Sequence, residues 1–191
     1  LPTWMARRGV IGLAGVDTRA LTRSIRQHGM PHAVIAHSPD GKFDLEALVA
    51  KAKAWSGLEG LDLARDASCL QPFVYHEGLW SWPDGYAKPD KPKYDVVVAE
   101  YGVKRNILRA LTSVGARATA FPANTSAEDI LARKPDGVLP SNGPGDPAAT
   151  GEYAVPTIRE LIDSGTPVFG ICLGHQMLSL AVGAKTMKME Q

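Results

Sequence analysis

The second half of the chain alternates short apolar runs with amphipathic segments, and this alternation limits the possible fold more than any other feature. The run at 96–99 reads Val-Val-Val-Ala, which is typical of a strand covered on both faces. Strands and helices in regular alternation favour a parallel sheet with helices on both faces. Thr125 and Glu128 have the spacing of a capping box for a short helix. We expect strands at 96–99, 117–121, 136–139 and 167–171, and longer helices at 103–114, 153–163 and 174–181.

The first 69 residues have a different character. Asp17 is placed to cap a helix that Gly29 ends. A short strand is expected at 30–37, and a second helix at 43–55. One short strand cannot form a sheet by itself. We therefore interpret residues 1–69 as the C-terminal part of a smaller α/β domain.

Residues 70–93 differ in composition from both neighbours. They contain four prolines and several aromatic residues, a pattern that breaks helices. We interpret 70–93 as a linker that joins the partial domain at 1–69 to an α/β domain at 94–191.

Composition argues against several classes of function. The net charge is +1 and no basic tract is present, so neither nucleic acid nor an anionic membrane is expected as a partner. No apolar run approaches the roughly 20 residues of a membrane helix, and the first residues do not form a signal peptide. From Cys69 and Cys172 we expect free thiols, no metal site and a cytoplasmic location. The start at Leu1, without an initiator Met, indicates a fragment or an internal start.

The strongest chemical signal is GICLG at 170–174, between an apolar strand and a helix. Its G-x-C-x-G spacing is a cysteine version of the nucleophile elbow, in which glycines give clearance around a strained turn. The positive end of the following helix favours the thiolate of Cys172, and the Leu173 N–H is placed to stabilise an oxyanion. A buried structural cysteine is the alternative, which the flanking glycines disfavour.

A second motif, SNGPGDP at 141–147, also follows a strand. Its glycines and prolines fix a rigid loop whose backbone can come close to a ligand. Taken alone, it would be interpreted as an ordinary tight turn. Paired with the elbow, an N–H of this loop could complete an oxyanion hole. Both motifs follow strands, and sites in parallel sheets lie at the carboxyl ends of strands.

Other polar residues give weaker signals. His175 lies one turn into the elbow helix, badly placed to approach the sulfur side-on as a general base, so we expect a structural role. The segment YGVKRNIL at 101–108 is a strand-loop-helix junction. We expect Lys104 and Arg105 in it to be solvated rather than to bind a ligand.

These motifs together resemble the class I, or triad, glutamine amidotransferases, through PVFGICLGHQ and SNGPGDP. Within that family the chain is most similar to the small-subunit family of carbamoyl phosphate synthetases. The segment at 15–29 matters most, since it lies outside the glutaminase part and other amidotransferases would not share it. The similar segments are GVDTRALTRSIRQHG at 15–29, YGVKRNILRAL at 101–111, PSNGPGDPAATGEYA at 140–154 and GAKTMKM at 183–189.

The resemblance implies that Cys172 attacks the side-chain amide of L-glutamine and forms a thioester with release of ammonia. Leu173 and Gly143 would supply backbone donors to the oxyanion, and Gly143, Gly145, Leu173 and Gln176 would bind glutamine. Ammonia would pass to a large synthetase subunit, which uses bicarbonate, ATP and Mg²⁺ to make carbamoyl phosphate for arginine and pyrimidine synthesis. No cofactor is expected in this chain itself.

The chain also departs from the family. The His-x-Glu pair that completes the triad lies C-terminal to the nucleophile, and these 191 residues contain no such pair. We therefore expect a glutaminase domain truncated at its C-terminus, which alone hydrolyses glutamine poorly or not at all. Glu100 stands where relatives usually carry Asp, and Pro140 where an apolar residue is usual.

Two alternative functions stay open. The chain could be a non-catalytic docking or regulatory module that binds a synthetase-like partner. It could also be another class I amidotransferase, such as one that serves anthranilate or GMP synthesis.

Overall fold

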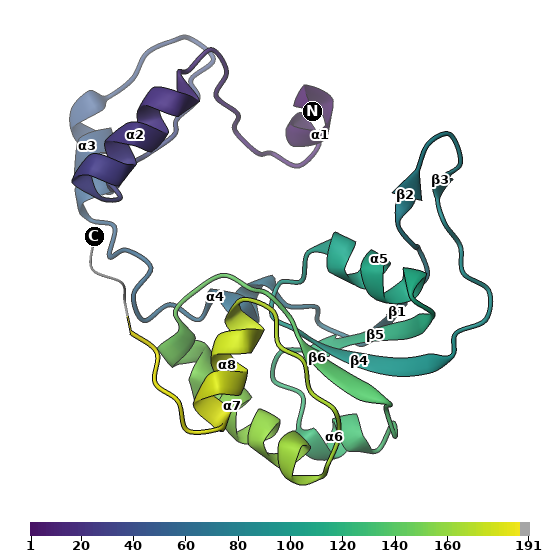
Figure 1. Cartoon of the computed structure of the whole chain (residues 1–191). Coiled ribbons are helices and arrows are strands. Elements are labelled where there is room, and N and C mark those ends of the chain that lie inside the picture. Colours follow the sequence, from purple (N-terminus) through teal and green to yellow (C-terminus); the bar gives the residue numbers. More distant parts are fainter. Residues whose placement is uncertain (188–191) are drawn as a thin grey trace. The chain divides into compact units, whose positions relative to one another are not determined.

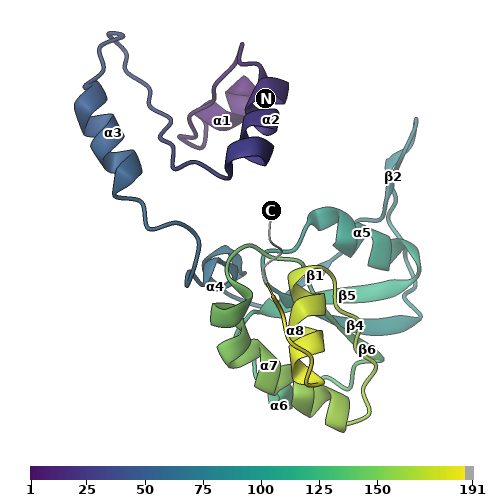
Figure 2. The same cartoon turned by 60° about the vertical axis from the view of Figure 1, so that its left-hand side comes forward.

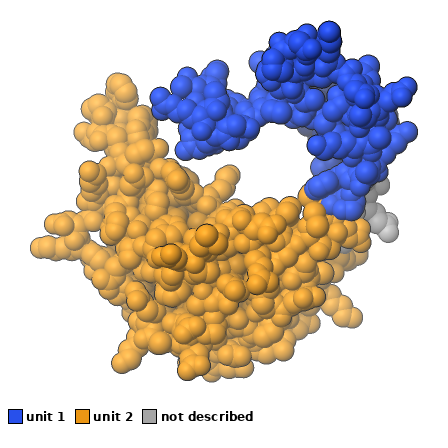
Figure 3. Space-filling view, turned by 180° about the vertical axis from the view of Figure 1, so that it is seen from behind, with its two compact units in different colours: residues 1–57, 189–191 blue, residues 58–188 orange. Residues whose placement is uncertain are grey.

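The computed structural model describes residues 1–187. The chain folds as two compact units, with residues 1–57 in one and 58–187 of the described part in the other, blue and orange in Figure 3. The motif at 183–189 and the expected domain at 94–191 both extend beyond the described residues. No helix in the described part is long and apolar enough to cross a membrane.

The first unit consists of helices joined by irregular segments, and no residue from 1 to 57 is buried. Its helices are α1 (Pro2–Ala6), α2 (Thr18–His28) and α3 (Leu45–Lys53). The Asp17 carboxylate accepts a hydrogen bond from the Ala20 N–H at the start of α2, and Gly29 ends this helix with a φ of 83°. The predicted capped helix is therefore confirmed, and the helix predicted at 43–55 is confirmed in a shorter form.

The predicted strand at 30–37 is wrong. These residues form an irregular segment, and no strand pairs with them in the described part of the chain. A strand is stable only when a neighbour satisfies its backbone N–H and C=O groups. Residues 1–57 thus contain no sheet, and their place at the end of an α/β domain stays a prediction.

The second unit is built on a four-stranded sheet with the order β1-β5-β4-β6 (Figure 1). Its strands are β1 (Phe73–Tyr75), β4 (Tyr94–Glu100), β5 (Ala116–Pro122) and β6 (Gly137–Pro140). β4 pairs in parallel with β5 and with β6, whereas β1 is an antiparallel edge. The predicted α/β fold with a mostly parallel sheet is confirmed. Residues 167–171 run beside β6 with a single bridge, between Val138 and Val168, instead of a full strand.

Helices cover both faces of this sheet (Figure 2). They are α5 (Arg105–Ser113) on one face, and α6 (Ala127–Leu131), α7 (Pro147–Asp163) and α8 (Leu173–Ala181) on the other. In β4, Val98 packs with Leu108 of α5, whereas Val97 packs with Ile130 of α6 and Leu161 of α7. Because alternate side chains of a strand point to opposite faces, β4 is covered on both sides, as predicted.

Two helices begin at residues other than the predicted ones, because different residues cap them. The Ser126 hydroxyl, and not Thr125, accepts a backbone N–H in the first turn of α6, at 3.1 Å. α7 begins at Pro147, well before the predicted start at 153. The Asp146 carboxylate caps it, and proline suits the first helical position.

Residues 58–69, predicted to end the first domain, pack on the second unit. They include α4 (Leu63–Ala67). Ala64 in this helix is fully buried. Asp62 caps α4 and also accepts a hydrogen bond from the Tyr153 hydroxyl of α7, at 3.1 Å. These contacts place the boundary between the compact units after residue 57 and not after residue 69.

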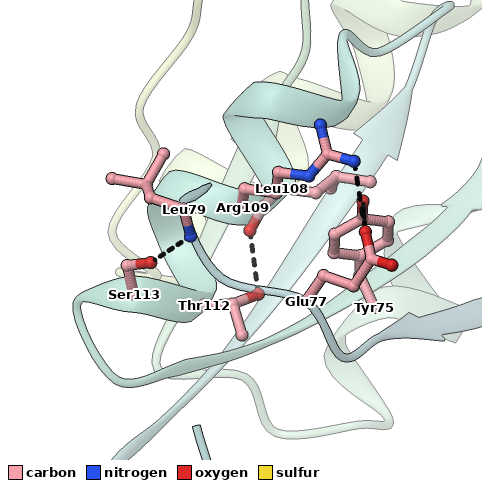
Figure 4. A network of polar contacts seen from close by, with 7 residues as sticks. All are labelled: Tyr75, Glu77, Leu79, Leu108, Arg109, Thr112 and Ser113. Atoms are coloured by element: carbon pink, nitrogen blue, oxygen red, sulfur yellow. Dashed lines mark hydrogen bonds and ion pairs between the residues drawn. The ribbon is translucent and has the colours of Figure 1, made fainter. Parts of the chain in front are cut away.

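Residues 70–93 are packed structure where a linker was predicted. Besides β1 they form a hairpin of β2 (Trp80–Ser81) and β3 (Gly85–Tyr86). Figure 4 shows Glu77 joining this segment to α5. The Arg109 guanidinium donates to the Glu77 carboxylate at 3.1 Å, and the Tyr75 hydroxyl donates to the same oxygen at 3.0 Å. These hydrogen bonds hold the pKa of Glu77 below its ordinary value.

The hairpin segment meets α5 at two further points. The Arg109 guanidinium lies 4.0 Å from the centroid of the Tyr86 ring, a cation–π contact. The Ser113 hydroxyl accepts a hydrogen bond from the Leu79 N–H at 2.7 Å (Figure 4). Phe73 and Tyr75 therefore belong to the edge strand of the sheet, whereas the β2–β3 hairpin forms a separate two-stranded sheet that contacts α5 through Tyr86 and Leu79.

The docking of 58–69 gives a stability prediction. Burial, and next the Asp62 carboxylate, raise the pKa of Tyr153, so its hydroxyl stays protonated and donates to Asp62. Tyr153→Phe removes this hydrogen bond and keeps the ring. We expect urea unfolding to show a loss of about 1 kcal/mol in the free energy of unfolding. Tyr94→Phe, at a 56% exposed residue, is the control and should change little. Equal stability of the two variants would contradict the role of the Asp62 contact.

Candidate active site

Cys172 occupies the sharp turn at the start of α8. Its φ is 53° and its ψ is −112°. A positive φ is uncommon for a residue other than glycine. Among the non-glycine residues that the structure describes, only Lys134 also has a positive φ. The Cys172 side chain is exposed. The predicted strained turn before a helix is therefore present, with the thiol open to a ligand.

Two glycines allow this turn to pass close to neighbouring backbone. A Cβ on Gly174 would overlap the carbonyl oxygen of Pro140, and a Cβ on Gly170 would overlap the carbonyl oxygen of Gly174. The Gly174 N–H donates to the Ser141 carbonyl at 2.9 Å. The elbow thus lies directly against the start of the SNGPGDP loop, and it requires glycine at both flanking positions.

The two expected oxyanion donors have no hydrogen-bond acceptor in the part of the chain that the structure describes. Among the described residues, neither the Leu173 N–H nor the Gly143 N–H donates a hydrogen bond. Leu173 is buried, and its N–H is at the positive end of α8. A Cβ on Gly143 would overlap the Tyr101 carbonyl oxygen, so only glycine lets this loop lie so close to Tyr101.

Side chains of the SNGPGDP loop hold it to the turn after β4. The Ser141 hydroxyl is fully buried, accepts the Tyr101 N–H at 3.0 Å and donates to the Asn142 carbonyl at 2.8 Å. The Asn142 amide oxygen accepts the Lys104 N–H at 2.9 Å, and its nitrogen donates to the Gly102 carbonyl at 3.3 Å. Backbone and side chain together leave the Gly143 loop little freedom to shift.

Gly145 and Gln176, both expected to bind glutamine, line one cavity of about 410 Å³. Asp146 and Glu59 also line it and contribute carboxylates. Local sequence gave no signal for Glu59, because it lies in the segment that was expected to belong to the first domain. Leu58 is another wall residue missed for the same reason.

The remaining expected residues are placed as follows. Lys104 and Arg105 are exposed at the start of α5, as expected of solvated residues. His175 is exposed in the first turn of α8, so the structural role expected for it stays a prediction. No cluster of three or more metal-binding side chains occurs among the described residues. The second thiol, Cys69, is partly buried, and burial followed by the nearby Glu100 carboxylate raises its pKa.

The close approach at Gly174 can be tested by adding one methyl group. Gly174→Ala forces a Cβ against the backbone of Pro140, and we expect a loss of about 1–3 kcal/mol of stability. Gly151→Ala, inside α7, meets its nearest neighbour at 3.6 Å and should gain about 0.5–1 kcal/mol. Chemical denaturation of both variants checks this. A Gly174→Ala protein as stable as the wild type would contradict the described packing.

Asp146 gives a pH prediction. Hydrogen bonds from the Gly60 and Ala148 N–H groups, both at 2.8 Å, hold its pKa below the ordinary 3.8. Its stabilising effect is therefore complete above about pH 4 and is lost as the pH falls through the lowered pKa. We expect the difference in thermal midpoint between the wild type and Asp146→Asn to shrink below about pH 4. Asp84→Asn, on the exposed hairpin, is the control; a pH-independent difference for Asp146→Asn would argue against this effect.

Comparison with known proteins matches two family models to different parts of the chain. The model of the class I glutamine amidotransferases matches residues 96–191. The model of the CPSase domain of the carbamoyl-phosphate synthase small chain matches residues 1–35.

Similar curated proteins carry the name carbamoyl phosphate synthase small chain. That of Caulobacter vibrioides is 79% identical over 188 residues, which are 98% of this chain and 48% of the relative. That of Brucella anthropi is 61% identical over 191 residues, 100% of this chain and 47% of the relative. That of Ruegeria pomeroyi is 60% identical over 190 residues, 99% of this chain and 49% of the relative. The chain spans about half the length of the curated relatives it matches. With the amidotransferase model matching residues 96–191 and the elbow it requires present, the chain belongs to the class I glutamine amidotransferase family.

Proposed function

We propose that this chain is the segment of a carbamoyl phosphate synthase small chain that carries the glutaminase nucleophile. The observation that carries the proposal is the positive φ of Cys172 at the start of α8, beside a Leu173 N–H that donates to no acceptor within residues 1–187. The small-chain model at residues 1–35 supports the assignment within the family.

In the proposed reaction the Cys172 thiolate attacks the carbonyl carbon of the glutamine side-chain amide. The developing oxyanion accepts hydrogen bonds from the Leu173 and Gly143 N–H groups. Collapse of this intermediate expels ammonia and leaves a thioester, which water hydrolyses to glutamate and the free thiol. Gly145 and Gln176 would hold the substrate, because both line one cavity; Gly143, Cys172 and Leu173 are not among the residues that line it.

The proton transfers need a general acid and base. Cleavage of the amide requires a proton on the leaving nitrogen, and hydrolysis of the thioester requires removal of a proton from water. Residues 1–191 contain no His-x-Glu pair, so we assign this role to such a pair in the longer protein. His175 points from the helix that carries the nucleophile and is not assigned to it.

The proposed partner is a large synthetase subunit in the cytoplasm. It would take up the ammonia and use bicarbonate, ATP and Mg²⁺ to make carbamoyl phosphate for the arginine and pyrimidine pathways. The words small chain in the names of the relatives, and the small-chain model at residues 1–35, support a larger partner chain.

Specific features argue against the alternatives. A docking or regulatory module has no use for a strained cysteine between two glycines that leave no space for a side chain. An amidotransferase for anthranilate or GMP synthesis would not need the small-chain domain that matches residues 1–35.

The nucleophile is tested in the full-length protein with its large subunit. We expect Cys172→Ser to lower glutamine-dependent ammonia release by about 10³-fold or more, while synthesis from added ammonia continues. Cys69→Ser is the matched thiol control and should keep its glutaminase rate. Normal glutamine hydrolysis by Cys172→Ser would refute the assignment, and loss of both activities would indicate misfolding.

The assignment of the general base to a His-x-Glu pair outside residues 1–191 is tested by comparing proteins of different length. We expect residues 1–191 alone to release ammonia from glutamine several orders of magnitude more slowly than a longer protein that contains the His-x-Glu pair. An assay of both proteins at equal concentration gives the ratio. Equal rates would mean that the base lies within residues 1–191.

A further inference from the structure

Glu100, the last residue of β4, has a buried carboxylate that accepts hydrogen bonds from backbone N–H groups. It is only 5% exposed, and in the described part of the chain no Lys, Arg or His forms an ion pair with it. Instead, three backbone N–H groups donate to it. They are Cys69 to Oε2 at 2.5 Å, and Gly102 and Val103 to Oε1 at 3.0 and 2.6 Å. Such charge-assisted hydrogen bonds offset the cost of burying a carboxylate.

The carboxylate fixes the turn at 101–103, and this turn supports the Gly143 loop. The Tyr101 N–H donates to the Ser141 hydroxyl, and the Tyr101 carbonyl oxygen lies where a Cβ of Gly143 would be. On the other side of the turn, Gly102 accepts a hydrogen bond from the Asn142 amide. The position of the Gly143 N–H therefore depends on a turn that Glu100 holds in place.

Glu100 also contacts the residues that directly follow α4. Its carbonyl oxygen accepts the Ser68 hydroxyl at 2.6 Å, and its carboxylate accepts the neighbouring Cys69 N–H. Ser68 and Cys69 follow α4 directly, and the chain just before α4 touches Gly145. A Cβ on Gly145 would lie 2.8 Å from the Leu61 carbonyl oxygen. The Glu100 side chain thus joins the turn that supports the Gly143 loop to the residues that follow α4.

We propose that Glu100 is a positioning residue for glutamine hydrolysis, which orients the Gly143 N–H through the turn at 101–103 without touching the substrate. This inference rests on the proposed function, since it requires Gly143 to act as an oxyanion donor. A carboxylate fits the role because all three contacts are donated to it. In a glutamine at this position, one oxygen becomes an NH₂ group that faces a backbone N–H.

The test compares Glu100→Gln with the wild type in the full-length protein. A chloroketone analogue of glutamine alkylates Cys172 through an addition that places charge on its carbonyl oxygen, whereas iodoacetamide needs no such donor. Loss of one oxyanion donor costs about 10²–10³-fold in rate, so a misplaced donor should slow the analogue by about 10-fold or more. We expect iodoacetamide to react at the wild-type rate. Glu160→Gln, on the exposed side of α7, is the matched control and should leave both rates unchanged.

Hydrogen exchange supplies a readout that does not depend on activity. We expect faster amide exchange in peptides that cover 101–104 and 141–145 of Glu100→Gln, and unchanged exchange in β5. Unchanged exchange at 141–145, equal labelling by the analogue, or equal slowing of both reagents would each overturn the proposal. If Glu100→Gln does not fold, Glu100→Met is judged by the same outcomes, because its side chain is of similar length but has no oxygen to accept the three N–H groups.

The two proposals fail in different ways. A wild-type protein whose Cys172 does not react with the glutamine analogue would refute the proposed function. In that case the exchange at 141–145 still decides whether Glu100 positions the loop. A wild-type protein that reacts, with a Glu100→Gln variant that reacts equally fast, would refute only the role of Glu100.

Discussion

The site depends on the close backbone contact between the elbow and the end of β6, where the Gly174 N–H donates to the Ser141 carbonyl and the Ile171 N–H donates to the Pro140 carbonyl. It brings the start of α8 against the end of β6, and no side chain fits between them. The contact places the Cys172 elbow next to the Gly143 loop. Because backbone groups at both ends are fixed by the sheet and the helix, the geometry does not rely on flexible side chains. The side chains of Ser141, Asn142 and Glu100 then hold the Gly143 loop and the turn after β4 together by hydrogen bonds.

Features encoded within a few residues were predictable from the sequence. The helix after Asp17 has its cap and its terminating glycine within one short segment. The strands and helices after residue 94 show their periodicity locally, and β4 is buried on both faces as its apolar run indicated. The elbow was predictable because its glycines, the strand before it and the helix after it are contiguous in sequence.

Features that depend on distant partners were not predictable. The apolar run at 30–37 has the composition of a strand but pairs with no strand among residues 1–187. The proline-rich segment does pair, since Phe73 lies opposite Ala120 of β5. Capping by Ser126 in place of Thr125 is a choice between adjacent hydroxyls that local spacing does not resolve. Glu100 differed from the usual Asp, yet its three donors come from two separate segments, so its contacts could not be inferred from sequence.

The docking of residues 58–69 matters for anyone who dissects or recombines this protein. A cut made at the change in composition near residue 70 would remove the buried Ala64, the Asp62 partner of Tyr153 and the Glu59 wall of the cavity. A cut just before Leu58 keeps all three with the sheet they pack on. Domain exchange between relatives should therefore keep residues 58–69 together with the α/β unit that carries Cys172, although they precede the first strand of that unit.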